Sequence, residues 1–481
     1  MALTAALALA ALLPAAAGET VLGVYIFHRH GDRTAKEWPP TSLTALGTEQ
    51  VLSSGTYYRN RYIGANASSP IAGVSHDLAV LSQLSVSAPV DSVLQNSAQA
   101  FLQGLYPPAG SVATQKLANG TDTNPPLGGY QYIPVNAVTS AASGSSSENS
   151  VWLQGTSGCG NAMISSNEYY TSTEYLDTLA STADFYKSLE PVINGTFTEA
   201  QASFKNAYAI YDLIHVATIH NSTIPSSSLL TPETLHQLQT RADQHEWGLA
   251  YNSSSPIRAV SGAVLAAQIV QSLNSTLQTA SAASGLKLGI QFGAYGTFMS
   301  FFGLAQLPAV SADFTGMVDY ASSFAVELVT NSTAARPAAA DVAVRFLFSN
   351  GSAGLNAAGL QPFPLFGRRE TLLPWDTFAS EMGKFAIGDT GAWCRACGNT
   401  TGVCADYAAG AAGAAGGDAG NGGGDGGVSR PVAGVIGAVV TLVVVLALEG
   451  LLMAVAGLRL TKKKAAFSTE AQADKLSTSS K

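Results

Sequence analysis

The apolar positions of the chain predict strands on either side of a long helical middle. Residues 20–27 (TVLGVYIF) form a short run of β-branched and aromatic residues, which is typical of a buried strand. Similar runs return at 286–292 (LKLGIQF) and 342–348 (VAVRFLF). Apolar residues at helical spacing predict helices over about 41–62 and near 198–221, 231–249, 257–282 and 297–305. This order indicates an α/β domain with an insertion at about 110–285.

Both ends of the chain carry apolar segments that are typical of targeting and anchoring. Residues 5–13 (AALALAALL) precede a proline and several small residues, so the sequence predicts a secretory signal peptide over residues 1–17. No basic residue precedes this run, which leaves a buried first helix as the alternative. Residues 432–458 are almost wholly apolar and long enough to cross a bilayer as one helix.

The segments beside the predicted membrane helix differ in composition and charge. Ten of the 18 residues from 410 to 427 are glycine, so we expect a flexible Gly/Ala-rich stalk over 408–431. The tail, 459–481, holds six basic and two acidic residues, which leaves a net charge of −12 for the rest of the chain. This asymmetry predicts a single-pass type I membrane protein at the cell surface or in the vacuole. Residues 18–407 would be its ectodomain and 459–481 its cytoplasmic tail.

Composition narrows the class of protein further. Only 12% of the 481 residues are charged and 47% are hydrophobic, which excludes extended disorder for most of the chain. The net charge of −8 excludes the basic surface of a nucleic-acid-binding protein. Nine N-glycosylation sequons precede the predicted membrane helix and predict N-glycans on the ectodomain. They lie at Asn66, Asn119, Asn194, Asn221, Asn252, Asn274, Asn331, Asn350 and Asn399.

The first predicted strand ends in a cluster of charged residues, Arg29-His30-Gly31-Asp32-Arg33. In open α/β sheets, ligands bind beyond the carboxyl ends of the strands, which is where this cluster is expected. Each of two guanidinium groups can donate two parallel hydrogen bonds to phosphate oxygens, and a neutral imidazole between them can attack phosphorus. The cluster therefore predicts a phosphate site, and a solvated charged turn is the alternative.

Together with later segments, this cluster resembles the histidine acid phosphatases, clade 2 of the histidine phosphatase superfamily. Residues 29–33 are similar to the RHGxR signature, 43–62 to the LTxxGxxQ…RxRY segment and 97–108 to the SA…GL[FY]PP segment of that family. Residues 246–252 and 393–394 are similar to secreted fungal members. The resemblance implies a three-layer α/β fold with a mainly parallel, phosphoglycerate mutase-like sheet and an inserted α-helical cap.

The resemblance also implies an activity, the hydrolysis of phosphomonoesters through a phosphohistidine, without a metal or other cofactor. His30 matches the nucleophile of the family, and Arg29 and Arg33 match two residues that bind the phosphate. The expected ligand is therefore a phosphomonoester or free phosphate.

Three positions of the family pattern are altered in this sequence. The third arginine of the family stands just before the SA segment, where this chain has Val93 or, with a one-residue gap, Ser92. A His-Asp pair follows a later strand of the family, and this chain has Tyr295-Gly296 there. The Asp protonates the leaving alkoxide, a role worth about 10²–10⁴-fold in rate, and glycine has no proton to give. The sequence predicts an impaired phosphatase, and the alternative is an inactive cell-surface pseudophosphatase that binds a phosphate ligand or acts as a scaffold.

The chain contains four cysteines, Cys159, Cys394, Cys397 and Cys404. In a secreted protein we expect them to form disulfides. If all four pair within one chain, Cys159 must pair with one of the other three and close a loop of more than 230 residues. The run WCRAC at 393–397 resembles a redox motif, but it lacks the strand-to-helix setting that a reactive thiolate needs.

Overall fold

The computed structural model describes residues 18–138 and 157–407. The predicted signal peptide (1–17), stalk (408–431), membrane helix (432–458) and tail (459–481) lie outside these residues. Within the two described ranges, no helix is both long enough and apolar enough to cross a membrane.

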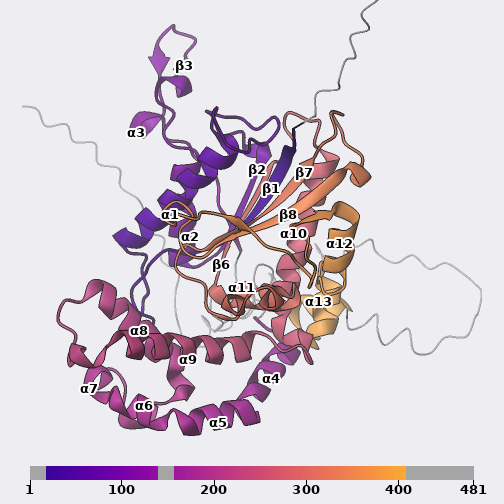
Figure 1. Cartoon of the computed structure of the whole chain (residues 1–481). Coiled ribbons are helices and arrows are strands. Elements are labelled where there is room, and N and C mark those ends of the chain that lie inside the picture. Colours follow the sequence, from indigo (N-terminus) through magenta and orange to yellow (C-terminus); the bar gives the residue numbers. More distant parts are fainter. Residues whose placement is uncertain (1–17, 139–156, 408–481) are drawn as a thin grey trace, which may run out of the picture. The chain divides into compact units, whose positions relative to one another are not determined.

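A mixed eight-stranded sheet forms the centre of the described part (Figure 1). The strand order is β10-β8-β7-β1-β6-β2-β5, and β9 pairs with β8. The strands are β1 (Thr20–Arg29), β2 (Leu84–Pro89), β5 (Asn136–Val138), β6 (Leu288–Gly293), β7 (Ser323–Thr330), β8 (Val342–Ser349), β9 (Gln361–Pro362) and β10 (Leu372–Pro374). The neighbours β5, β2, β6 and β1 are parallel, as predicted, whereas β7 to β10 pair with antiparallel neighbours. A separate hairpin joins β3 (Gln115–Lys116) and β4 (Asp122–Thr123).

Helices cover both faces of the sheet, which confirms the predicted three layers (Figure 1). In β1, successive side chains point to opposite faces. Val24 and Ile26 pack with α1 (Ala45–Tyr58) and α2 (Ser92–Leu105) in one apolar core. Tyr25 and Phe27 pack on the other face with three further helices. These are α10 (Val260–Gln278), α11 (Tyr295–Leu304) and α12 (Trp375–Gly383).

The inserted cap consists of the helices between residues 160 and 250, which Figure 1 shows below the sheet. They are α4 (Gly160–Glu168), α5 (Thr173–Ser181), α6 (Ala183–Ser188), α7 (Glu190–Ile193), α8 (Ala207–His220) and α9 (Pro232–Ala250). Most of them share an apolar core of their own, separate from the two cores of the sheet. The next helix, α10, lies within the predicted insertion of 110–285 but packs directly on β1. A one-turn helix, α3 (Pro126–Gly129), precedes the cap.

A buried carboxylate at the middle of β7 ties three elements together. Glu327 is 0% exposed. Its Oε1 lies 2.8 Å from Nη2 of Arg61 and accepts a hydrogen bond from the hydroxyl of Tyr62 at 2.7 Å. Its Oε2 lies 2.9 Å from Nη1 of Arg345 on β8. Arg61 and Tyr62 stand in a π-helical turn, Arg59–Ile63, that extends α1. The charge of Glu327 is thus matched by two arginines from other segments.

All four cysteines form disulfides within the chain, as predicted. Cys159 pairs with Cys397, 238 residues away, and Cys394 pairs with Cys404, ten residues away. Cys394 and Cys397 lie on α13 (Thr390–Cys397), so this helix is joined both to the start of the cap and to the segment that follows it. The alternative redox role of WCRAC would need these two cysteines to pair with each other, and they do not.

Candidate active site

Three parallel strands end at one edge of the sheet and bring the predicted site together there. β1 and β6 pair in a register that places Arg29 opposite Gly293. His30 and Ala294 therefore leave the sheet at the same edge. From the helix that follows β2, Ser97 accepts a hydrogen bond from the backbone N–H of Gly31 at 3.3 Å. The site loop, residues 30–33, is thus held by segments that are far apart in the sequence.

Two glycines allow α1 to approach the site loop backbone to backbone. A Cβ on Gly31 would collide with the backbone carbonyl of Gly47, and a Cβ on Gly47 would collide with the backbone of Asp32. Only glycine permits so close an approach. The hydroxyl of Thr44 caps α1 by accepting a hydrogen bond from the N–H of Gly47 at 3.0 Å. This contact requires glycine at both positions of this chain.

His30 is held in the tautomer that a nucleophile requires. The residue is 2% exposed, and Nδ1 lies 2.7 Å from the carbonyl oxygen of Gly31. A carbonyl can only accept a hydrogen bond, so Nδ1 carries the proton and Nε2 keeps its lone pair. Burial, and then the charges of Arg29 and Arg33, lower the pKa of His30 well below 6.5. The imidazole is therefore neutral, as attack on phosphorus demands.

Arg29 is enclosed by aromatic rings. Its guanidinium carbon lies 5.2 Å from the ring centre of Tyr295 and 4.7 Å from that of Tyr320, and its Nη1 donates to the carbonyl of Val318. The cavity that Arg29 lines measures only about 20 Å³, which is room for about one water molecule. Its lining is Arg29, Tyr208, Tyr211, Asp212, His215, Met317, Val318, Asp319 and Tyr320. A phosphate group can reach Arg29 only if some of these side chains move.

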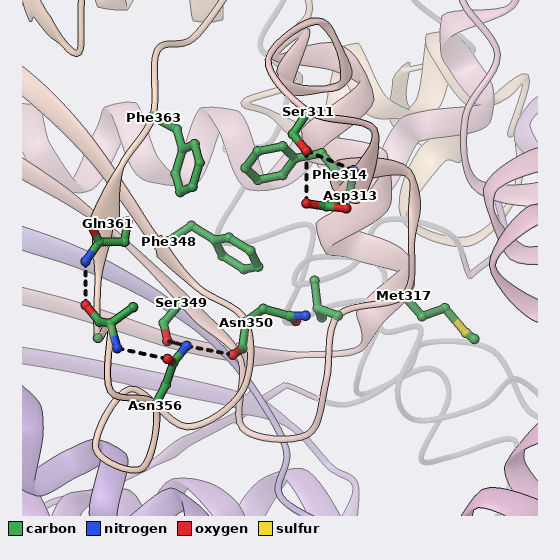
Figure 2. Close-up of a pocket in the computed structure, with 13 residues that line it drawn as sticks. Ser311, Asp313, Phe314, Met317, Phe348, Ser349, Asn350, Asn356, Gln361 and Phe363 are labelled. Atoms are coloured by element: carbon green, nitrogen blue, oxygen red, sulfur yellow. Dashed lines mark hydrogen bonds between the residues drawn. The ribbon is translucent and has the colours of Figure 1, made fainter. Parts of the chain in front are cut away.

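A much larger cavity of about 280 Å³, shown in Figure 2, shares part of its lining with this small one. The two cavities share Met317 and Val318 as lining residues. The segment that accepts the hydrogen bond from Arg29 therefore forms a wall between them.

Arg33 is already paired with a carboxylate from the cap. Its Nη2 lies 2.8 Å from Oδ1 of Asp212, and its Nη1 lies 3.1 Å from Oδ2. The same Nη2 also donates to the hydroxyl of Tyr208 at 2.9 Å. Asp212 accepts a further hydrogen bond from the backbone N–H of Lys36 at 2.8 Å. The guanidinium that the family pattern assigns to phosphate thus faces an anion supplied by the protein.

The two residues of the altered pair, Tyr295 and Gly296, lie in different surroundings. The Tyr295 ring stacks near Arg29, and its hydroxyl donates to Oε2 of Glu246 at 2.8 Å. Burial and then the charge of Glu246 raise the pKa of Tyr295 well above 10, so this phenol stays protonated. Gly296 instead lines a different cavity of about 270 Å³, together with Glu246 and Arg258. A Cβ at position 296 would meet nothing within 4 Å.

The position that the family pattern gives to a third arginine is apolar and buried. Val93 lies in the first turn of α2 and is 1% exposed. Its neighbour Ser92 carries no charge either. Of the predicted site residues, the structure brings His30, Arg29, Arg33 and Tyr295 together. Val93 is buried in α2, and Gly296 lines another cavity.

Sequence reasoning missed the contribution of the cap. Tyr208, Asp212 and His215 stand at positions i, i+4 and i+7 of α8, which places them on one face of the helix. All three line the cavity at Arg29. The helical spacing of these polar and aromatic residues could have indicated a functional face on this helix.

The cap contacts the site loop at a second point. Nε2 of His220, at the end of α8, lies 2.6 Å from Oδ1 of Asp32. Asp32 is fully buried, whereas the side chain of His220 is 36% exposed. Two acid–base pairs, Arg33–Asp212 and Asp32–His220, thus join the site loop to α8.

Comparisons with known protein families identify the family of this chain but do not cover the site loop. No curated protein matches the sequence. The sequence model of the histidine phosphatase superfamily (branch 2) matches residues 36–349, a range that begins after Arg33. The positions of residues 29–33 in the site therefore come from the structure and not from this match.

Several solved structures share the fold. A phytase from Citrobacter braakii is 14% identical, with a TM-score of 0.52 over 79% of this chain and 99% of its own. The apo form of Hafnia alvei phytase is 13% identical, with a TM-score of 0.52 over 80% of this chain and 99% of its own. A Klebsiella phytase is 12% identical, with a TM-score of 0.50 over 78% of this chain and 99% of its own. At these identities the likeness establishes a common fold.

Proposed function

Because the chain belongs to the histidine phosphatase superfamily, branch 2, we propose that it is a phosphomonoester hydrolase with a strongly impaired active site, in which His30 accepts the phosphoryl group. The observation that carries this proposal is the geometry of His30. The Gly31 carbonyl holds Nδ1, the pKa is lowered, and Arg29 and Arg33 adjoin the ring. A neutral Nε2 beside two guanidinium groups is the arrangement that a phosphohistidine requires.

The impairment follows from the groups around the nucleophile. Asp212 already accepts hydrogen bonds from both Nη atoms of Arg33, and the position of the family's third arginine is taken by the uncharged Val93. The phenol of Tyr295, whose pKa lies well above 10, is a poor substitute for a carboxylic acid that must protonate an alkoxide. Aryl phosphates with good leaving groups depend less on that proton. We therefore expect slow turnover of aryl phosphates and far slower turnover of alkyl phosphates.

The direct test is to trap the covalent intermediate. The purified protein would be mixed with an activated aryl phosphate at mildly acidic pH, quenched, and analysed for phosphohistidine by mass spectrometry. His30→Ala should abolish both the trapped species and the residual turnover. His76→Ala is the matched control, because Nδ1 of His76 lies 2.5 Å from the carbonyl oxygen of Ile63 and His76 is not among the site residues described above. Wild-type turnover that survives His30→Ala would contradict the proposal, because it would place the chemistry elsewhere.

A second candidate function is that of an inactive cell-surface protein that binds a phosphate ligand or acts as a scaffold. The Arg33–Asp212 pair and the 20 Å³ cavity favour the absence of turnover, because a substrate cannot contact both arginines unless these side chains move. Binding of phosphate or vanadate with no trapped phosphohistidine would support this candidate over the first.

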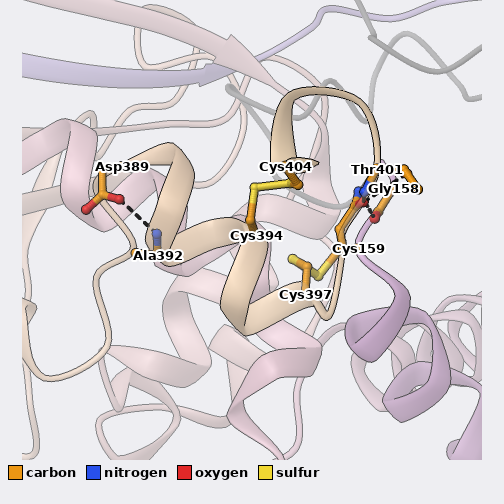
Figure 3. The surroundings of a disulfide bond; sticks show 9 residues. Gly158, Cys159, Asp389, Ala392, Cys394, Cys397, Thr401 and Cys404 are labelled. Carbon is orange, nitrogen blue, oxygen red and sulfur yellow. Dashed lines mark hydrogen bonds between the residues drawn. A yellow bond between two sulfur atoms is a disulfide. The ribbon is translucent and has the colours of Figure 1, made fainter. Parts of the chain in front are cut away.

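We further propose that residues 18–407 form a glycosylated ectodomain in the secretory pathway, anchored by the predicted helix at 432–458. The two disulfides support this location, because such bonds persist in oxidising compartments (Figure 3). The nine sequons all fall within described residues, and seven of their asparagines are exposed, while Asn252 and Asn399 are partly buried. Protease added to intact cells should spare an epitope tag placed after Lys481. Degradation of that tag would contradict the orientation.

A further inference from the structure

The 280 Å³ cavity beside the active site is lined by three phenylalanine rings and several polar side chains. Phe314, Phe348 and Phe363 form its apolar wall, with ring centres 5.0–6.4 Å apart. The amides of Asn356 and Gln361 complete the wall shown in Figure 2. Aromatic rings pack against the C–H faces of a pyranose. Nδ2 of Asn356 already donates to the carbonyl of Asn350 at 3.1 Å, and Nε2 of Gln361 donates to that of Ala358, so the three rings are the features that suit a sugar. The volume is near the lower end for ligand pockets, about 300 Å³, which suits a single sugar ring.

The asparagine of a sequon forms part of this lining. Asn350 is the first residue after β8 and opens the sequon Asn350-Gly351-Ser352. Its side chain is exposed and extends into the pocket in Figure 2. Oδ1 accepts hydrogen bonds from the backbone N–H of Asp319 at 2.8 Å and from the hydroxyl of Ser322 at 3.0 Å. Two donors on Oδ1 fix the orientation of the amide, so Nδ2, the atom that carries an N-linked glycan, is presented on the opposite side.

We propose that Asn350 carries an N-linked glycan whose first N-acetylglucosamine packs into this pocket as a structural part of the protein. The inference rests on the proposed secretory location. A sugar that is covalently attached at the rim has already lost most of its translational freedom. It can therefore occupy a small pocket that would bind the same sugar only weakly from solution.

The sugar would act on the segment that positions Arg29. Val318 lines both cavities, and its carbonyl accepts the hydrogen bond from Arg29. The N–H of the next residue, Asp319, is one of the two donors that hold Asn350. A sugar packed against Met317 and Val318 would therefore keep this segment closed over Arg29.

The test compares release of individual glycans under native and denaturing conditions. The full chain would be expressed in eukaryotic cells that glycosylate, treated with an endoglycosidase that cuts within the glycan core, and mapped by peptide mass spectrometry. We expect Asn350 to be occupied and its glycan to be released at least tenfold more slowly than those of the exposed sites Asn194 and Asn331. After denaturation the three rates should be equal. Phe363→Ala should raise the native rate at Asn350 without changing its occupancy.

Three outcomes would overturn the inference, and they separate it from the secretory proposal. An unmodified Asn350 in a protein whose Asn194 and Asn331 are glycosylated would refute the inference alone. So would native release at Asn350 as fast as at the two control sites. A chain with no occupied sequon would refute the secretory location and the inference together.

Discussion

Arg33 and Asp212 form a buried ion pair with two points of contact, Nη2 to Oδ1 at 2.8 Å and Nη1 to Oδ2 at 3.1 Å. Their side chains are 1% and 5% exposed. Arg33 belongs to the loop after the first strand, and Asp212 belongs to α8 of the cap, so the pair joins the two parts. A carboxylate offers a guanidinium the same two acceptors as one edge of a phosphate. Asp212 therefore competes with any phosphate ligand for this arginine.

The first prediction concerns this competition. Asp212→Asn keeps an acceptor oxygen but removes the negative charge, so phosphate and vanadate should bind about tenfold more tightly, which corresponds to about 1.4 kcal/mol. Titration calorimetry would measure the change. Asp177→Asn removes a charge from an exposed position on α5 and should leave binding unchanged. Equal affinities for Asp212→Asn and the wild type would show that Asp212 does not compete.

The second prediction concerns the pH dependence of the nucleophile. Burial and the two arginines lower the pKa of His30 well below 6.5. An unfolded histidine titrates near pH 6.5, so the unfolded state takes up this proton first as the pH falls. The stability contributed by neutral His30 is full above about pH 6.5 and is lost below it. The rate of phosphohistidine trapping should not show an imidazole titration near pH 6.5. A rate that halves at that pH would contradict the neutral, buried nucleophile.

The elements that the sequence predicted are those with a local pattern. The strand at 20–27 and the helix at 231–249 correspond to β1 and α9 within two residues at each end. The strand β7 was not predicted, because Glu327 interrupts its run of apolar residues. This charge is acceptable only because Arg61 and Arg345 reach it from other segments. No local pattern contains that information.

The residues of the site also fall into two groups, those that a local sequence pattern reveals and those that it does not. His30 and its two flanking arginines are contiguous in the sequence and could be recognised together. Asp212 reaches Arg33 across 179 positions, and Glu246 reaches Tyr295 across 49. Helical spacing places Asp212 on one face of α8, but it does not specify which site residue that face meets, because this depends on how the cap packs on the sheet.

The third prediction concerns the buried charges of β7. Glu327→Ala leaves Arg61 and Arg345 without their carboxylate and should lower the free energy of unfolding by about 3–5 kcal/mol. Glu199→Ala is the matched control, because its pair with Lys187 spans 3.9 Å and both side chains are mostly exposed. Its effect should stay within about 0.5 kcal/mol. Denaturant unfolding of both variants measures the difference, and equal effects would contradict it.

The fourth prediction concerns Asp243 on α9, whose Oδ1 accepts a hydrogen bond from the N–H of Met317 at 2.8 Å. Burial, opposed by this hydrogen bond, raises the pKa of Asp243 to about 6. An unfolded aspartate titrates near 3.9, so between about pH 4 and 6 the folded state binds more protons, and stability falls as the pH rises.

Asp243→Asn keeps an acceptor for the N–H of Met317 but cannot ionise. We expect the variant to match the wild type near pH 4 and to be more stable above pH 6, by on the order of 3 kcal/mol. Thermal unfolding across this pH range measures the difference. Parallel curves for the two proteins would contradict the raised pKa.

The last prediction uses the two disulfides as controls for each other. Cys159–Cys397 and Cys394–Cys404 lie in one buried cluster with Val260 and Trp393, so replacing either pair by alanine removes similar packing. The loops that they close differ greatly, with separations of 238 and ten residues. In the chain-entropy model the longer loop contributes roughly 5.5 kcal/mol and the shorter roughly 2.7 kcal/mol. Cys159→Ala with Cys397→Ala should therefore lose about 3 kcal/mol more stability than Cys394→Ala with Cys404→Ala. Denaturant unfolding of the two double variants decides this, and equal losses would mean that the long link does not restrain the unfolded chain.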